Sequence, residues 1–430
     1  MLAGIIIVLF VVLLLLSVPI GSTLGIISIA PSLIDADFGI SAEFIIRSMF
    51  GGIDSFALLA IPMFVLSGII MARGGISKRL FDTFSYFLAD KTAGIPCAVV
   101  VTCLFYGAIS GSAPATVAAV GAMSMPVMLR LGYDKKFSTA LVAVAGGLGV
   151  IIPPSIPYIL YGSATGASVS KMFIAGVIPG FLVAGLLMGY CVYYCKKHGE
   201  DKEKIQVEVD SLKQRGFLSI LKDGSWALLT PVIILGCIYS GVASPTEAAV
   251  ISVFYALIIS VFVYKTLKIS EIKDVLVESL RTFTPILFIL AAAVSFSRIL
   301  TLLQVPQMSA TFLTVNFSNK WIVLLLINIL LLIVGMVMDT SPAILILAPI
   351  LQPIMATYGM DTIQFGIIMV LNLAIGFVTP PIGVNLFIAS RLTEVPVFTI
   401  AKKALPLIVL LMVALVLICI FPQISMILVA

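Results

Sequence analysis

Small hydroxyl side chains and glycines flank helix-breaking prolines at four places in an otherwise apolar chain. Two of these places, 149–162 and 376–389, each contain a Pro-Pro pair. The other two are short polar stretches, "SGSAP" beginning at Ser110 and "DTSP" beginning at Asp339. Proline ends a helix and removes a backbone donor, whereas glycine lets the backbone approach another group closely. Such segments expose carbonyl oxygens, amide groups and hydroxyls, which suit hard cations and carboxylates.

Two sites follow, each combining one polar stretch with one Pro-Pro segment. A helix that stops offers partly negative carbonyls, and a helix that starts offers free N–H groups. The candidate cation ligands are oxygen atoms of Ser110, Gly111, Ser112, Gly149, Ile152, Pro153, Asp339, Thr340, Ser341, Gly376 and Thr379. The candidates for binding a substrate are Pro114, Pro154, Ser155, Pro342, Pro381 and Asn385. The sequence leaves open which of the two breaks holds which ligand.

The composition predicts an all-α polytopic membrane protein. Of the 430 residues, 61% are hydrophobic and only 10% are charged, and apolar stretches of spanning length recur from end to end. The first stretch lacks a basic region and a cleavage site, so we expect a retained helix. Irregular backbone at membrane depth is tolerated only where protein or a water-filled cavity covers it.

The prolines and glycines that interrupt or end helices recur in the same order in the second half of the chain. Pro153-Pro154 is followed by Pro380-Pro381 at an offset of 227 residues (153 to 380). The same offset relates five further pairs: Gly149 and Gly376, Pro126 and Pro353, Gly132 and Gly359, Asp134 and Asp361, and Pro179 and Pro406. A collinear series predicts an internal repeat. Duplication favours a functional role over prolines that only kink helices and serines that only bond back to carbonyls.

Basic residues in short loops predict that the second repeat is inverted. The loop with Arg73, Lys78 and Arg79 is expected inside, together with the N-terminus, whereas Asp35 and Asp37 are expected outside. The expected division is a first repeat at 1–195, a charged cytoplasmic linker at 196–224, a connecting helix at 225–244, and an inverted second repeat at 245–430 with its C-terminus outside.

Each repeat should contain one re-entrant helical hairpin and one Pro-Pro-broken helix. The hairpins are expected at 95–130, entering from the cytoplasm, and at 321–358, entering from outside. Each arm of the first hairpin should have about ten to fifteen residues, too short for the ~20 that a crossing takes. The broken helices are expected at 137–163 and 363–389, with Pro154 and Pro381 at the favoured first position of the next half-helix.

The quoted segments resemble the large membrane subunit of TRAP (tripartite ATP-independent periplasmic) transporters, the DctM family. "IIPPSIPYILYG", "VTPPIGVNLFIAS" and "SGSAPAT" carry this resemblance, which runs over nearly the whole chain. It implies a Na⁺-driven importer of an organic acid, such as a C4-dicarboxylate or sialic acid, in a bacterial inner membrane. It also implies an elevator-type transporter, in which hairpins and broken helices slide against a scaffold, with Na⁺ as the coupling ion.

The resemblance further implies partners. They are a separate small four-helix membrane subunit, a periplasmic substrate-binding protein that faces the outer side, and the lipid bilayer. It implies no catalytic residue, no further cofactor and no nucleic acid.

Three other functions share parts of the pattern. A stand-alone elevator-type anion:Na⁺ symporter would need no binding protein, and a channel would show flux without a Na⁺ gradient. An intramembrane enzyme is disfavoured because no H-E-x-x-H or Gly-x-Gly-Asp signature occurs. The single histidine, His198, lies in the charged linker and cannot easily reach a membrane-buried serine.

Overall fold

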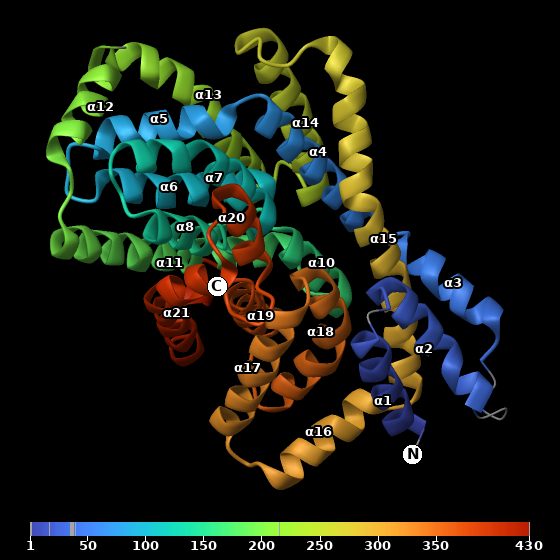
Figure 1. Ribbon diagram of the computed structural model, residues 1–430. Coiled ribbons are helices and arrows are strands. Elements are labelled where there is room, and N and C mark those ends of the chain that lie inside the picture. Colours follow the sequence, from blue (N-terminus) through green and yellow to red (C-terminus); the bar gives the residue numbers. More distant parts are fainter. Residues whose placement is uncertain (1, 17, 35–37, 39, 215, 430) are drawn as a thin grey trace.

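The computed structural model describes residues 2–16, 18–34, 38, 40–214 and 216–429. All regular structure in this part of the chain is helical (Figure 1). Within it eight helices are long and apolar enough to cross a membrane, and the bent pair Lys135–Ile151 and Ile156–Thr165 makes a ninth if counted as one span. The prediction of an all-α polytopic membrane protein is therefore confirmed. Asp35 and Asp37 lie outside the described residues.

Seven helices form one group, which we call the framework. Within it α4 lies along α14, and α15 contacts α2, α3 and α4. These helices run from the top of Figure 1 down its right-hand side. The framework consists of α1 (Leu2–Leu15), α2 (Ile20–Ile34), α3 (Ala42–Ile53), α4 (Ala60–Arg73), α13 (Phe217–Tyr239), α14 (Pro245–Ile258) and α15 (Ile272–Leu302).

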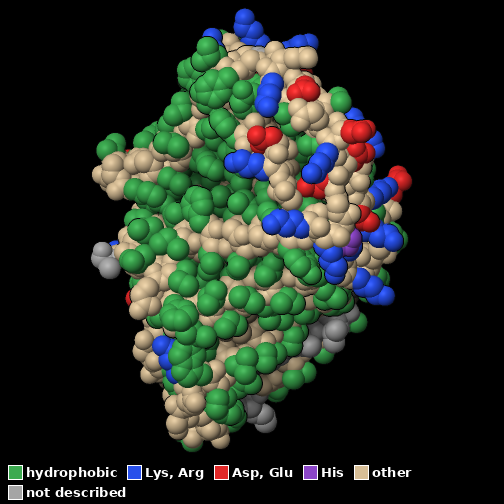
Figure 2. Space-filling view, turned by 90° about the vertical axis from the view of Figure 1, so that its left-hand side faces the viewer, with side chains coloured by type: hydrophobic (Ala, Val, Ile, Leu, Met, Phe, Trp, Pro, Cys, Tyr) green, Lys and Arg blue, Asp and Glu red, His purple; other side chains and the backbone are tan. Residues whose placement is uncertain are grey.

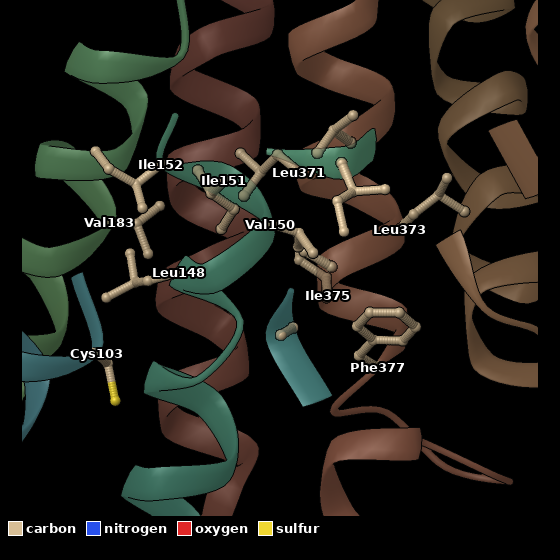
Figure 3. Packing of buried hydrophobic residues seen from close by; sticks show 14 of the residues in the cluster. Cys103, Leu148, Val150, Ile151, Ile152, Val183, Leu371, Leu373, Ile375 and Phe377 are labelled. Atoms are coloured by element: carbon tan, nitrogen blue, oxygen red, sulfur yellow. The ribbon is translucent and has the colours of Figure 1, made fainter. Parts of the chain in front are cut away.

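A second group, the inner group, interleaves helices from the two halves of the chain. In it α7 contacts α20, α8 contacts α21, and α10 contacts α18. Its members are α6 (Gly94–Ser110), α7 (Ala113–Arg130), α8 (Lys135–Ala145), α9 (Leu148–Ile151), α10 (Ile156–Thr165), α11 (Val169–His198), α17 (Lys320–Val337), α18 (Thr340–Thr357), α19 (Thr362–Gly376), α20 (Val384–Thr393), α21 (Val397–Ile420) and α22 (Gln423–Met426). Figure 3 shows its buried core, where Val150 and Ile151 lie close to Leu371 and Ile375.

Two helices, α5 (Ile76–Leu88) and α16 (Val305–Asn316), connect the framework to the inner group. α5 contacts α6 and α13, and α16 contacts α15 and α18. α12 (Lys202–Gln214) packs against α5 at the end of the molecule where charged side chains gather in Figure 2. The lower part of the same face has many hydrophobic and few charged side chains, as expected for a surface that meets lipid. Three short turns complete the structure: η2 (Phe56–Leu59), η3 (Ile259–Val263) and η4 (Ile269–Glu271).

Equivalent residues start equivalent helices in the two halves. Asp134 caps α8 by accepting a hydrogen bond from the N–H of Phe137 at 2.6 Å. Asp361, at the offset of 227, caps α19 by accepting from the N–H of Ile363 at 2.7 Å. Each carboxylate satisfies a donor that the first turn of a helix leaves unpaired. Both Pro-Pro bonds are cis.

Several expected boundaries differ from the structure. The hairpin arms have 17 and 18 residues, not ten to fifteen, because the first helix continues to Ser110 and only Gly111 and Ser112 form the tip. The linker contains the helix α12, and α13 begins at Phe217 rather than 225.

The expected position of Pro154 and Pro381 at the first residue of a half-helix is wrong. Ser155 stays extended after Pro154, so α10 begins at Ile156 and Pro157 takes the favoured place in its first turn. In the second break Gly383 has a left-handed conformation, with φ of 65°. A right-handed helix cannot include this residue, so α20 begins at Val384.

Candidate functional site

The tip of the first hairpin lies against the first break. The backbone N–H of Ile156 donates to the carbonyl of Gly111 at 3.2 Å. Gly111 has φ of 61°, a left-handed conformation that glycine adopts without steric cost. The hairpin and the beginning of α10 are therefore joined through backbone atoms.

Close backbone contact also joins the hairpin to the helix before the break. A β-carbon on Gly149 would lie 2.5 Å from the carbonyl oxygen of Ser112, and one on Gly107 would lie 2.7 Å from the Cα of Gly149. No side chain fits between these segments. The glycine at 149, which the sequence analysis singled out, is therefore required for contact between the two chain segments.

Hydroxyl groups are concentrated around the first tip. The Oγ of Ser110 lies 3.0 Å from Oγ1 of Thr116, which donates to the carbonyl of Ser112 at 2.8 Å. Thr116 and Ser110 are buried. The sequence analysis did not select Thr116, although its position one helical turn after Ser112 could have indicated it.

The three prolines of the first break remove helical donors from the carbonyls four residues earlier in the chain. Two carbonyls near this break find new partners. Ser155 Oγ donates to Val150 at 2.6 Å, and Tyr158 Oη donates to Ile151 at 2.8 Å. Ser155 and Tyr158 therefore stabilise the end of the first half-helix.

The second tip carries a carboxylate. Asp339 is the N-cap of α18, and its Oδ1 accepts from the N–H of Ser341 at 2.9 Å. The same oxygen lies 3.5 Å from Oγ1 of Thr340. Thr340 and Ser341 are buried, whereas Asp339 is partly accessible. The tip thus presents a carboxylate and two hydroxyls within one turn of the chain.

The second break contacts its hairpin in a similar way. The N–H groups of Ile382 and Gly383 donate to the carbonyl of Met336 at 3.3 and 3.4 Å. A β-carbon on Gly376 would lie 2.3 Å from the carbonyl carbon of Gly335. The hydroxyl of Thr379 donates to the carbonyl of Ile375 at 2.7 Å. Glycine again allows the direct contact between hairpin and broken helix.

Both tips line one central cavity of about 350 Å³. The framework closes its other side through Ile20 of α2 and through Thr282 and Pro285 of α15. Among the described residues that line it, Asp339 has the only charged side chain. From the two hairpin units the cavity is lined by Gly111, Ser112, Pro114, Val150, Ile156, Pro157, Asp339, Thr340, Ser341, Pro342 and Phe377.

Apart from Ser110, the predicted residues thus fall into two classes. Seven line the central cavity: Gly111, Ser112, Pro114, Asp339, Thr340, Ser341 and Pro342. Nine others support the breaks from behind or lie beside them: Gly149, Ile152, Pro153, Pro154, Ser155, Gly376, Thr379, Pro381 and Asn385. Asn385 is fully buried, and its Nδ2 donates to the carbonyl of Ala143 at 3.1 Å, which joins α20 to α8.

A second cavity of about 400 Å³ adjoins the first, and Ser110 lines it. The two cavities share Ser112, Ile156, Thr282 and Ile286. The second one extends between α4, the first hairpin and α15 as far as Glu278. The two cavities thus lie between the first hairpin and part of the framework.

The electrostatics of the central cavity suit a cation and a carboxylate together. In the described part of the chain, no group of three or more His, Cys, Asp and Glu side chains could hold a metal ion. A cation in the cavity would therefore depend on hydroxyl and carbonyl oxygens and on Asp339, which is the ligand set of a hard ion. The N-terminus of α7, which has no side-chain cap, offers partial positive charge to an anion.

Known proteins of similar sequence include several transporter subunits. Residues 7–424 match the family described as "Tripartite ATP-independent periplasmic transporter, DctM component". The isethionate TRAP transporter permease protein DctMQ of Oleidesulfovibrio alaskensis is 42% identical over 97% of this chain, which spans 65% of that protein's length. The C4-dicarboxylate TRAP transporter large permease protein DctM of Pseudomonas aeruginosa is 41% identical, over 87% of this chain and 86% of that protein. The sialic acid TRAP transporter large permease protein SiaM of Vibrio cholerae is 34% identical, over 97% of this chain and 96% of that protein.

A solved structure has a similar fold. The YdaH transporter of Alcanivorax borkumensis superposes with a TM-score of 0.63, covering 96% of this chain and 97% of that one at 18% identity. The family match spans nearly the whole chain, and the matched family consists of transporter permeases and not of enzymes. The chain therefore belongs to the DctM family, the large permeases of bacterial TRAP transporters.

Proposed function

We propose that the protein is the large permease of a Na⁺-coupled importer of an organic acid anion. The observation that carries this proposal is the central cavity, where two hairpin tips meet a framework surface around a single carboxylate. The proteins similar to it are named for isethionate, C4-dicarboxylates and sialic acid, all of which are acids. We propose a substrate of this class.

The different capping of the two tips suggests which ligand binds at each of them. Ser112 makes no side-chain cap, so the first N–H groups of α7 remain available for a carboxylate of the substrate. The first turn of α18 is already capped by Asp339, which favours a cation there. We propose that Na⁺ binds to oxygens of both tips and that Asp339 provides the strongest attraction.

The position of the cavity supports an elevator mechanism. Its walls come from two groups of helices, because the tips belong to the inner group and α2 and α15 belong to the framework. A shift of the inner group relative to the framework would carry the bound ligands across the membrane. Equivalent helices that start 226 to 228 residues apart (94 to 320, 113 to 340, 156 to 384) support the repeat on which such a motion would be based.

The rest of the proposed assembly follows from the family. The words tripartite and periplasmic in its description support a periplasmic substrate-binding protein and a small membrane subunit as partners. We propose that this small subunit is a separate four-helix chain and that the complex lies in the bacterial inner membrane. In the proposed orientation the N-terminus, α12 and the loop after α14 face the cytoplasm, and the C-terminus faces the periplasm.

Uptake in proteoliposomes tests the proposal. The permease, its small subunit and the co-encoded binding protein would be supplied with radiolabelled succinate, isethionate and sialic acid. We expect uptake of one of them that depends on an inward Na⁺ gradient and disappears when K⁺ replaces Na⁺. Full uptake without any binding protein would instead identify a stand-alone symporter, and uptake without a gradient would identify a channel.

Single hydroxyl variants test the cation ligands. Ser112→Ala and Thr340→Ala should each raise the Na⁺ concentration for half-maximal uptake by about fivefold, the effect of one lost hydrogen-bonding group. Ser211→Ala is the matched control, since Ser211 is exposed on α12. Unchanged Na⁺ dependence in both tip variants would exclude these hydroxyls as ligands.

A further inference from the structure

An ion pair lies where the second cavity ends. Glu278 of α15 lines this cavity, and its Oε2 pairs with Nη2 of Arg73, the last residue of α4. Among the described residues that line the second cavity, Glu278 has the only charged side chain. In the proposed orientation this end faces the cytoplasm, so the cavity connects the central cavity to the inner side of the membrane.

The backbone next to Arg73 is held firmly. The carbonyl of Gly74 accepts from Nη1 of Arg79 at 3.2 Å and from Oγ1 of Thr266 at 2.9 Å. The carbonyl of Gly75 accepts from Arg79 at 3.1 Å. A β-carbon on Gly74 would lie 2.2 Å from Oγ of Ser260, so this turn packs tightly against η3. The helix end that carries Arg73 is therefore fixed.

The ion pair is open to water. The side chains of Arg73 and Glu278 are 40% and 46% exposed. An exposed pair contributes little to stability because water competes with it, so its partners exchange readily. Arg73 can thus leave Glu278 for another carboxylate without a large loss of free energy. A buried pair would not permit this exchange, because separation would leave a desolvated charge.

The negative charge of Glu278 would repel an anionic ligand. An anion that moves from the central cavity along α15 approaches this carboxylate, and two like charges in a confined cavity repel each other. Arg73 cancels the charge of Glu278 while the two are paired. It also offers a guanidinium, whose planar donors match a carboxylate.

We propose that Arg73 and Glu278 form an exchangeable charge pair at the inner mouth of the transport path. Arg73 neutralises Glu278 when the path is empty and turns to the carboxylate of the anion that leaves the central cavity. The pair thereby speeds release to the cytoplasmic side. This inference rests on the proposed function as an anion importer, and it adds a binding residue outside the hairpin tips.

A set of four variants tests the pair in the proteoliposome assay. R73Q leaves Glu278 unpaired in the path, so the maximal rate of uptake of succinate, isethionate or sialic acid should fall about tenfold. The double variant R73Q/E278Q removes both charges and should return to within about threefold of wild type. E278Q leaves Arg73 free to retain the anion and should lower both the maximal rate and KM. R73K keeps the charge but lacks the planar donors, so its rate should fall between those of wild type and R73Q.

A purely structural role of the ion pair, in which it only holds α4 against α15, predicts the opposite result. If the ion pair only held the helices together, the double variant would be as impaired as R73Q, and this result would overturn the proposal. Uptake by R73Q at the wild-type rate would overturn it as well. Arg281 lies exposed one turn further along α15, so R281Q serves as the matched control for loss of a positive charge at this end and should keep the wild-type rate.

The assay separates failure of the inference from failure of the proposed function. If the wild-type complex takes up none of the three acids, anion import itself is contradicted. If the wild type transports one of them and the double variant does not recover relative to R73Q, only the charge pair is contradicted. Thermal unfolding of each variant in detergent shows that the compared proteins are equally folded.

Discussion

The two hairpin units have the same architecture but different chemistry. The first unit, α6 to α10, has a neutral Ser-Gly-Ser tip, and its break, from Ile151 to Ile156, is buried. The second unit, α17 to α20, has Asp339 at its tip, and its break reaches the surface at Pro381 and Ile382. The two units thus share their backbone geometry but differ in the polar groups that face the shared cavity.

This difference indicates that the glycines and the polar groups have separate tasks. Glycine contacts at Gly149 and Gly376 occur in both units and hold each hairpin against its broken helix. The carboxylate occurs in one unit only and sets the charge of the cavity. Replacing the contact glycines should therefore affect the two units alike. Replacing the polar tip residues should affect them unequally.

The largest effect is expected for Gly376→Ala and Gly149→Ala. Each β-carbon would lie within about 2.5 Å of backbone atoms of the neighbouring hairpin, so the segments must separate. Overpacking of this kind should lower the free energy of unfolding by about 3 kcal/mol and abolish uptake. Thermal unfolding in detergent measures the first effect.

Gly185→Ala is the control for these two variants. Gly185 lies on α11 with no atom within 4 Å of an added β-carbon, so its replacement should keep or slightly raise the unfolding temperature. If only one of the two variants were destabilised, the glycine contacts would not be equivalent in the two units.

An intermediate effect is expected for Asp339→Asn, which makes the second tip neutral like the first. The Na⁺ concentration for half-maximal uptake should rise about tenfold, equivalent to about 1.4 kcal/mol of lost attraction. This exceeds the effect expected for Ser112→Ala, because a carboxylate attracts a cation more strongly than a hydroxyl does. Equal Na⁺ dependence of these two variants would show that the chemical difference between the tips is unimportant for the ion.

The smallest effect on uptake is expected for the hydroxyls behind the breaks, whose replacement should act on stability. Ser155→Ala leaves the buried carbonyl of Val150 without its donor and should cost about 1–3 kcal/mol of stability. Thr379→Val should cost less than about 1 kcal/mol, because the carbonyl of Ile375 also accepts from the N–H of Val378 at 3.1 Å. Chemical or thermal unfolding of the two variants side by side measures the difference in their stability. Equal losses of stability would show that the two hydroxyls stabilise their breaks equally.

Sequence patterns predicted the all-helical membrane class and seven of the residues that line the central cavity. Apolar stretches were sufficient to predict the membrane class. The repeated prolines at 153 and 380 were sufficient to predict the helix breaks, because proline interrupts a helix through its own backbone. The tips "SGSAP" and "DTSP" were found for the same reason: polar residues in an apolar stretch need a specific environment.

Features that depend on distant contacts were not predicted. Two separate sites were expected, whereas the tips of both units line one cavity, because α10 packs against α18. Asn385 was expected to face a substrate, but it bonds to Ala143, 242 residues away. The start of α20 depends on the left-handed Gly383 more than on Pro381, and a local pattern of prolines could not indicate that.

The glycine contacts also have a genetic consequence. Any single-base change of a glycine codon that alters the amino acid adds a β-carbon. At Gly107, Gly149 and Gly376 that atom would lie 2.7 Å or less from neighbouring backbone. Related genes should therefore accept almost no missense change at these three codons, whereas the codon of Gly185, where space is open, should vary freely.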